Sequence, residues 1–209
     1  MSNPDNLPRI WWCPTGAFAF LPLHAAGIYT GAENGDTNVA EFAISSYTPI
    51  ISALLTPHLP VDCPKVVAVI VPKTDAGLPP LPATKEELKS ISKHVPENSL
   101  SSLVGLKTSI DDVLSELATA TVAHFACHGV QHFTNPLDSA LILYRDRLTV
   151  SKLMENRIQN ASLVFLDACF TASGSQELPD EAIHLASAML FVGFRGAIAT
   201  LWYVGNFLA

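Results

Sequence analysis

Apolar residues in this chain fall into short runs, and the segments between the runs have helical periodicity. The first regular run is KVVAVIVP (65–72), whose β-branched residues are typical of a strand buried on both faces. SALILY (139–144) fits a hairpin arm or an edge strand better than a crossover unit. Other apolar runs predict strands at 99–105, 121–127, 162–168 and 197–204.

The polar positions between these runs predict helices. Thr84 and Glu87 fit a capping box that opens a helix through about His94. Ser109 is the expected cap of the next helix, IDDVLSELA. Further helices are expected at 45–55, at 148–156 and from Pro179 to Phe191.

Strands and helices alternate along the chain after residue 65. This order predicts an α/β fold with a mainly parallel sheet and helices on both faces. We expect one domain over residues 1–209, with an N-terminal part (1–60) rich in aromatic, proline and glycine residues and a core (65–209).

Composition narrows the function. Apolar residues make up 49% of the chain, which suits a large core. The net charge of −7 argues against a general nucleic-acid binder, which needs a basic face to meet phosphates. An acidic surface is compatible with a cationic peptide substrate, and it is also common on ordinary soluble proteins.

The four cysteines form no CxxC pair, and their spacing predicts no disulfide framework. We therefore expect a reducing, cytoplasmic compartment. The N-terminus lacks the basic start of a signal peptide, and no apolar run reaches the roughly 18 residues of a membrane span, so no membrane association is expected.

Two of the expected buried strands end in residues that can do chemistry. One strand is followed by His128 and Gly129, and the other by Cys169. If the strands are neighbours, about 4.8 Å apart, both side chains emerge at one edge of the sheet, where imidazole can take the thiol proton. The N–H groups of Gly129 and Cys169 are then candidate oxyanion donors.

From the residues alone, two simpler interpretations stay open. A lone cysteine after an apolar strand is more often a packed thiol, and a His-Gly pair at a strand end is more often a turn. The combination of both at adjacent strand ends is what favours a nucleophile and its base.

Several segments resemble a known family, the CHAT domain, a caspase- and separase-like peptidase domain often found beside TPR repeats. The order of histidine before cysteine is also that family's order. The matching segments are 14–27, 45–55, 81–88, HFACHG (124–129), SLVFLDACFTASG (162–174) and FRGAIATLWYV (194–204).

The resemblance implies a caspase-like sandwich around a mainly parallel sheet, and cleavage of peptide bonds by a cysteine and a histidine. Carried over by position, His128 is the general base and acid, Cys169 is the nucleophile and Gly129 donates to the oxyanion. It implies no cofactor and no metal. The implied partners are a protein or peptide substrate and a regulatory repeat domain or other regulatory partner. Nucleic acid is not expected, because the net charge is negative.

Asp167 lies two residues before Cys169, so strand alternation places the two on the same side. The related metacaspases carry an acidic residue at this spacing that receives a basic P1 residue, the substrate residue before the scissile bond. We therefore expect Asp167 to bind Arg or Lys at P1. The alternative is a strand-end carboxylate satisfied by neighbouring N–H groups. His124 is expected to be a core or hydrogen-bonded histidine.

This chain departs from the family pattern at its end. The pattern continues past the tryptophan motif with an acidic residue and a helix, whereas the sequence reads WYVGNFLA and stops. The main rival to a cysteine endopeptidase is therefore a catalytically silent caspase-like module for signalling or interaction. A nucleotide-binding domain is disfavoured, because no glycine-rich phosphate motif follows the first regular strand.

Overall fold

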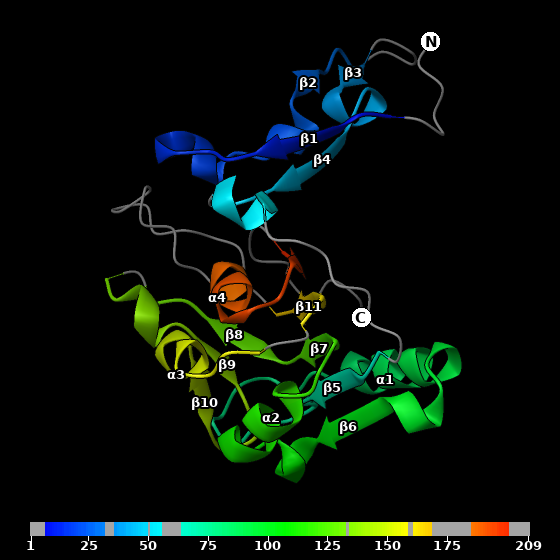
Figure 1. Ribbon diagram of the computed structural model, residues 1–209, viewed down its shortest axis with the longest axis vertical. Coiled ribbons are helices and arrows are strands. Elements are labelled where there is room, and N and C mark those ends of the chain that lie inside the picture. Colours follow the sequence, from blue (N-terminus) through cyan, green and yellow to red (C-terminus); the bar gives the residue numbers. More distant parts are fainter. Residues whose placement is uncertain are drawn as a thin grey trace.

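A five-stranded parallel sheet forms the centre of the computed structural model, which describes residues 7–31, 36–49, 51–55, 64–132, 134–158, 161–168 and 185–200 (Figure 1). The strand order is β12-β11-β7-β5-β6. The strands are β5 (Val66–Ile70), β6 (Leu100–Val104), β7 (Val122–Ala126), β11 (Leu163–Asp167) and β12 (Gly196–Ala199). This confirms the α/β class and the mainly parallel sheet. Residues 201–204 of the last expected strand lie outside the described residues.

Helices cover both faces of this sheet. α1 (Ala83–His94) packs on one face, where Leu88 and Ile91 meet a small cluster formed by Ala68, Ile70 and Ala126. The opposite face carries the main core under α2 (Ile110–Leu117), α3 (Val150–Met154) and α4 (Leu185–Val192). The arrangement confirms the caspase-like sandwich. None of the helices among the described residues is long and apolar enough to cross a membrane.

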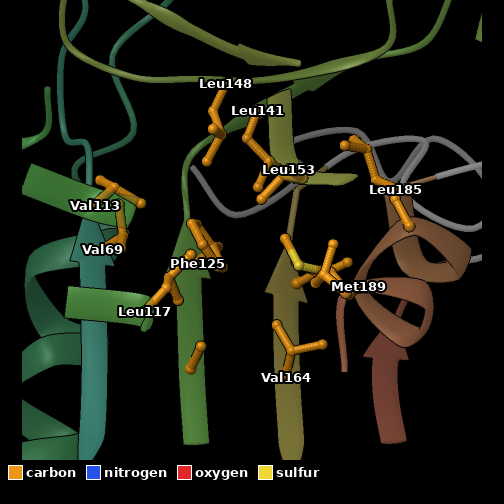
Figure 2. Close-up of a cluster of buried hydrophobic side chains, with 14 of the residues drawn as sticks. Val69, Val113, Leu117, Phe125, Leu141, Leu148, Leu153, Val164, Leu185 and Met189 are labelled. Carbon is orange, nitrogen blue, oxygen red and sulfur yellow. The ribbon is translucent and has the colours of Figure 1, made fainter. Parts of the chain in front are cut away.

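Strict alternation along the strands separates the two clusters. In β7, Ala123 and Phe125 are fully buried in the main core, whereas Ala126 faces α1. Figure 2 shows Phe125 and Val164 in one cluster with side chains from the covering helices, among them Leu117 and Met189. A large apolar area is thus removed from water on one side, and this burial is the main favourable contribution to folding.

A second, antiparallel sheet follows directly from the central one. β8 (His128–Val130) pairs with β9 (Ala140–Ile142), which pairs with β10 (Arg147–Thr149). This confirms the hairpin expected at 139–144. Only Cys127 separates β7 from β8, so the chain passes from one sheet to the other immediately before His128.

The N-terminal elements lie together at one end of the molecule (Figure 1). β1 (Arg9–Trp12) pairs in parallel with β4 (Ile44–Tyr47), and β2 (Gly27–Ile28) pairs with β3 (Thr37–Asn38). Short 3₁₀ helices complete the described part of the chain, at Gly16–Phe20, Leu23–Ala25, Val39–Glu41, Ile51–Leu55, Glu97–Ser99, Gly105–Lys107 and Pro136–Asp138.

Two sequence predictions about helices were wrong. Residues 45–55 form a strand end and a separate 3₁₀ turn, because Pro49 disfavours helical backbone at the residue before it. Thr84 and Glu87 do not cap α1. The helix begins at Ala83, the Thr84 hydroxyl donates to the Leu81 carbonyl, and the Glu87 carboxylate bonds a distant histidine.

The remaining helix predictions stand. Ser109 caps α2 by accepting a hydrogen bond from the backbone N–H of Asp112. The helix expected at 148–156 is α3, preceded by the short strand β10. α4 corresponds to the end of the helix expected from Pro179, and residues 179–184 lie outside the described residues.

Candidate active site

His128 lies where the order of strands in the sheet reverses. The chain runs from β5 outward to β6 and then returns to β7 on the other side of β5. Loops that leave the carboxyl ends of β5 and β7 therefore diverge, and in open α/β sheets this crevice is where ligands bind. His128 follows β7 directly, and residues 71–82 form the loop after β5.

A backbone carbonyl from that loop orients the His128 ring. Nε2 of His128 lies 2.7 Å from the carbonyl oxygen of Pro79. A carbonyl oxygen only accepts, so Nε2 carries the hydrogen of this bond, and in the neutral ring Nδ1 has the free lone pair. His128 is partly exposed. The ring is thus prepared to accept a proton at Nδ1 near the sheet edge.

The loop after β5 is itself held in place. The backbone N–H of Asp75 donates to the Tyr144 carbonyl (2.8 Å), and the Asp75 carboxylate accepts from Nε of Arg145 (2.9 Å). The Leu81 N–H closes the loop onto the Pro72 carbonyl (2.8 Å). The bond from Arg145 is the main reason that the pKa of Asp75 lies below its usual value.

Three polar side chains meet on the α1 face of the sheet, near the same edge. Nε2 of His124 lies 2.9 Å from the Glu87 carboxylate, and the charge of Glu87 acts on the Asp167 carboxyl group. The residues come from α1, β7 and β11. His124 also stacks on Phe165, with ring centroids 5.2 Å apart. His124 is therefore a hydrogen-bonded histidine, as expected from the sequence.

The two carboxyl groups of this cluster are shifted in opposite directions. The hydrogen bond from His124 lowers the pKa of Glu87, against the effect of burial. Partial burial of its carboxyl group raises the pKa of Asp167, and the negative charge of Glu87 raises it further. Asp167 consequently holds a proton more tightly than an ordinary aspartate.

Strand pairing relates this cluster to the two expected catalytic positions. β7 and β11 are parallel neighbours, with Ala126 opposite Asp167. The N–H of Cys127 continues the ladder to the Asp167 carbonyl at 3.4 Å. This confirms the condition on which the sequence argument depended, that the strands before His128 and Cys169 are adjacent. Cys169 itself lies outside the described residues.

The other residues near this edge have simpler environments. Gly129 is the middle residue of β8 and is paired with Leu141. Cys127 is 2% exposed, and burial is the main cause that raises the pKa of its thiol to about 12. Cys127 is therefore an inert core thiol at neutral pH. The described residues contain no group of three or more side chains suited to hold a metal ion.

Glu87 is the residue of this edge that sequence reasoning missed. Its spacing from Thr84 suggested a local role in helix capping, whereas its partners come from strands far along the chain. One observation argued against the capping interpretation: Pro82, after the apolar Leu81, is suited to begin the helix before Thr84.

A comparison with known families bears on the whole chain. The model of the CHAT domain family matches residues 2–209. The chain belongs to the CHAT domain family. CHAT domains are caspase-like cysteine peptidases at the level of the family, which agrees with the sandwich fold. No curated protein matches this CHAT domain.

Proposed function

We propose that this CHAT domain is a cysteine endopeptidase in which Cys169 is the nucleophile and His128 is the general base and acid. The hydrogen bond between His128 Nε2 and the Pro79 carbonyl carries the proposal. It fixes the tautomer that leaves Nδ1 free to accept a thiol proton, and this is the arrangement that a nucleophilic cysteine needs.

Covalent geometry supports the pairing of His128 with Cys169. Asp167 lies beside Ala126, and each catalytic residue follows its strand partner by two positions. Two residues of chain span at most about 7 Å, and this short reach is compatible with the proposed pairing of Cys169 with His128.

The proposed reaction has two steps. Nδ1 of His128 takes the proton from Sγ of Cys169, and the thiolate attacks the scissile carbonyl to form a carbon–sulfur bond. As the tetrahedral intermediate collapses, the carbon–nitrogen bond breaks and His128 protonates the leaving amine. His128 then takes a proton from water, whose oxygen attacks the thioester carbonyl. The carbon–sulfur bond breaks, the acid product leaves, and His128 returns the proton to Sγ of Cys169.

We assign the oxyanion donors to the backbone N–H groups of Gly129 and Cys169. Gly129 follows the proposed base directly, and a glycine allows a substrate carbonyl to approach the backbone closely. Donors of this kind are aimed at the charge that develops on the carbonyl oxygen, and removing one typically costs about 100-fold or more in rate.

The proposed substrate is a protein or peptide with Arg or Lys at P1, bound by Asp167. Asp167 is exposed at the carboxyl end of β11, two residues before the proposed nucleophile. The net charge of −7 favours approach of a cationic peptide. We also propose a cytoplasmic location, where the thiol stays reduced, and control by a repeat domain of the kind that accompanies this family.

Peptide cleavage tests the P1 assignment. We expect kcat/KM to be higher for fluorogenic peptides ending in Arg or Lys than for matched peptides ending in Leu. Asp167→Asn should lower the Arg-to-Leu ratio by at least about tenfold, because the substrate cation loses its charged partner. The control is Asp111→Asn in α2, an exposed change on the opposite face. Equal or better cleavage after Leu by the unaltered protein contradicts the assignment.

A further inference from the structure

A cavity lies between the loop after β5 and the antiparallel sheet that begins at His128. Its volume is about 290 Å³. The apolar walls include Leu78 of the loop, Val130 of β8 and Ile142 of β9. Ile142 is 4% exposed and therefore firmly packed. A cavity of this size is at the lower end of the range for ligand pockets and can hold one side chain of a bound peptide.

Strand register places His128 and Arg147 in one row on the face of the sheet that borders this cavity. His128 of β8 is directly opposite Ile142 of β9, and Ile142 is directly opposite Arg147 of β10. Directly opposite residues of antiparallel strands point to the same face of a sheet. Neighbouring strands are about 4.8 Å apart, so the backbone of Arg147 lies about 10 Å from that of His128.

The loop after β5 brings the cavity next to the proposed base. The Pro79 carbonyl oxygen lies 2.7 Å from Nε2 of His128, and Leu78, the residue before Pro79, lines the cavity. Ala76 of the same loop lines it as well. The cavity therefore begins within one residue of the contact that orients His128, and a peptide bound at His128 passes close to it.

The charges around the cavity leave Arg147 available to a ligand. Arg145 also lines the cavity, but its guanidinium is bound to the Asp75 carboxylate at 2.9 Å. Asp146 is a further lining residue. Within the part of the chain that the structure describes, Arg147 is exposed and forms no ion pair with Asp146 or with another carboxylate.

Apolar walls beside an available guanidinium are complementary to an acidic side chain with an apolar stem. The methylene groups of a glutamate can pack against the walls, while its carboxylate accepts two parallel hydrogen bonds from the planar guanidinium. A lysine or arginine of a substrate would instead meet a like charge at Arg147, which disfavours it.

The proposed reaction decides which part of the substrate reaches the cavity. The P1 residue is proposed to lie at Asp167 of β11, and His128 protonates the leaving amine, which belongs to the residue after the scissile bond. β5 lies on the other side of β7 from β11. A peptide with its P1 residue at β11 therefore continues past His128 toward the loop after β5.

We propose that the cavity beside Arg147 is a subsite for an acidic side chain, glutamate above all, in the substrate segment after the scissile bond. The inference rests on the proposed function and adds a second element of specificity to it. An extended peptide advances about 3.3 Å per residue, so about three residues cover the distance from His128 to Arg147. The preferred substrate thus carries an acidic residue within three positions after the scissile bond.

The test compares quenched fluorogenic peptides that carry Glu or Gln at the first, second or third position after the scissile bond. Glu and Gln have nearly the same shape, so the ratio of their kcat/KM values isolates the charge. Two series, with Arg and with Leu at P1, make the result independent of the P1 assignment. In the unaltered protein we expect Glu to be preferred about fivefold at one of the three positions.

Variants of Arg147 assign this preference to the cavity. Arg147→Gln should bring the Glu-to-Gln ratio to about one, and Arg147→Glu should favour Lys over Gln at the same position, because the charges are then exchanged. The matched control is Arg157→Gln, which removes the same charge at an exposed position that borders a different cavity. Its ratio should equal that of the unaltered protein. Thermal melts of all variants report whether they fold.

The outcomes separate the subsite from the peptidase. A Glu-to-Gln ratio near one at all three positions, or a preference that Arg147→Gln retains, overturns the subsite and leaves the proposed function intact. A preference that Arg157→Gln loses equally reflects the net charge and also overturns the subsite. Absence of cleavage of every peptide by the folded, unaltered protein counts against the peptidase, and the subsite fails with it.

Discussion

Cys127 illustrates how burial alone removes a thiol from chemistry. It lies in the main core between β7 and β8, one residue before the proposed catalytic histidine, and its sulfur has no access to solvent that would stabilise a thiolate. Burial, followed by the negative charge of Asp167, raises its pKa from 9.0 to about 12. Proximity to a catalytic residue in sequence thus does not make this cysteine a nucleophile.

This shift links stability to pH. Because the folded-state pKa of Cys127 is above its unfolded value, the contribution is complete below about pH 9 and is lost as the pH rises toward 12. The unaltered protein should lose about 1 kcal/mol more unfolding free energy between pH 8 and pH 10 than Cys127→Ala does. Denaturant titrations with a reductant measure this difference, and parallel losses in the two proteins would disprove the assignment.

The hydrogen-bond partners of two histidines could not be predicted from the sequence. His124 was expected to be hydrogen-bonded, but its partner could not be named, because Glu87 is 37 residues away and on another element. The same holds for the Pro79 carbonyl, 49 residues from His128. A backbone carbonyl carries no residue-type information, so no sequence pattern indicates such a contact.

Among the elements, the loop after β5 connects the sheet to α1 and supplies the carbonyl that orients His128. Gly77 makes the turn in this loop possible. Its φ is 74°, a backbone conformation that residues with a side chain rarely adopt. No atom lies within 4 Å of where a Cβ of residue 77 would stand, so a substitution there strains the backbone without a steric clash.

Gly77→Ala should therefore cost about 1 kcal/mol of stability and slow the acylation of Cys169 by about tenfold, because it displaces the Pro79 carbonyl from His128. The control is Gly31→Ala in the N-terminal part, which has a similar φ of 70° and equally open space. It should cost similar stability and leave acylation unchanged. If both variants react at the rate of the unaltered protein, the loop does not orient His128.

Among the elements, short sequence patterns predicted those features that depend only on residues close together in the chain. The β-branched runs predicted strands of the main sheet, and Ser109 was correctly predicted to cap α2. Both features depend on residues only a few positions apart. The helix expected at 45–55 failed because its apolar spacing concealed a strand that needs a distant partner, β1. Tertiary pairing overrode the local pattern there.

At the scale of the whole molecule, the order of strands in the sheet determines where the candidate active site lies. The order of strands reverses between the adjacent strands β5 and β7, so the loops after both strands begin at one edge of the sheet, and β11 adds Asp167 to that edge. The alternation of strands and helices predicted a parallel sheet but not its order, because order depends on which crossovers pack against which face. The prediction that His128 and Cys169 lie near each other required β7 and β11 to be neighbours, and the structure shows that they are.

The most direct measurement is the intact mass of the protein after treatment with an electrophilic peptide that carries Arg at P1. We expect a single covalent adduct that is absent in Cys169→Ala, slowed at least about 100-fold in His128→Ala and unaffected in Cys127→Ala. Thermal melts confirm that each variant is folded. An adduct that persists in Cys169→Ala, or no adduct on the folded, unaltered protein, would contradict the proposed dyad.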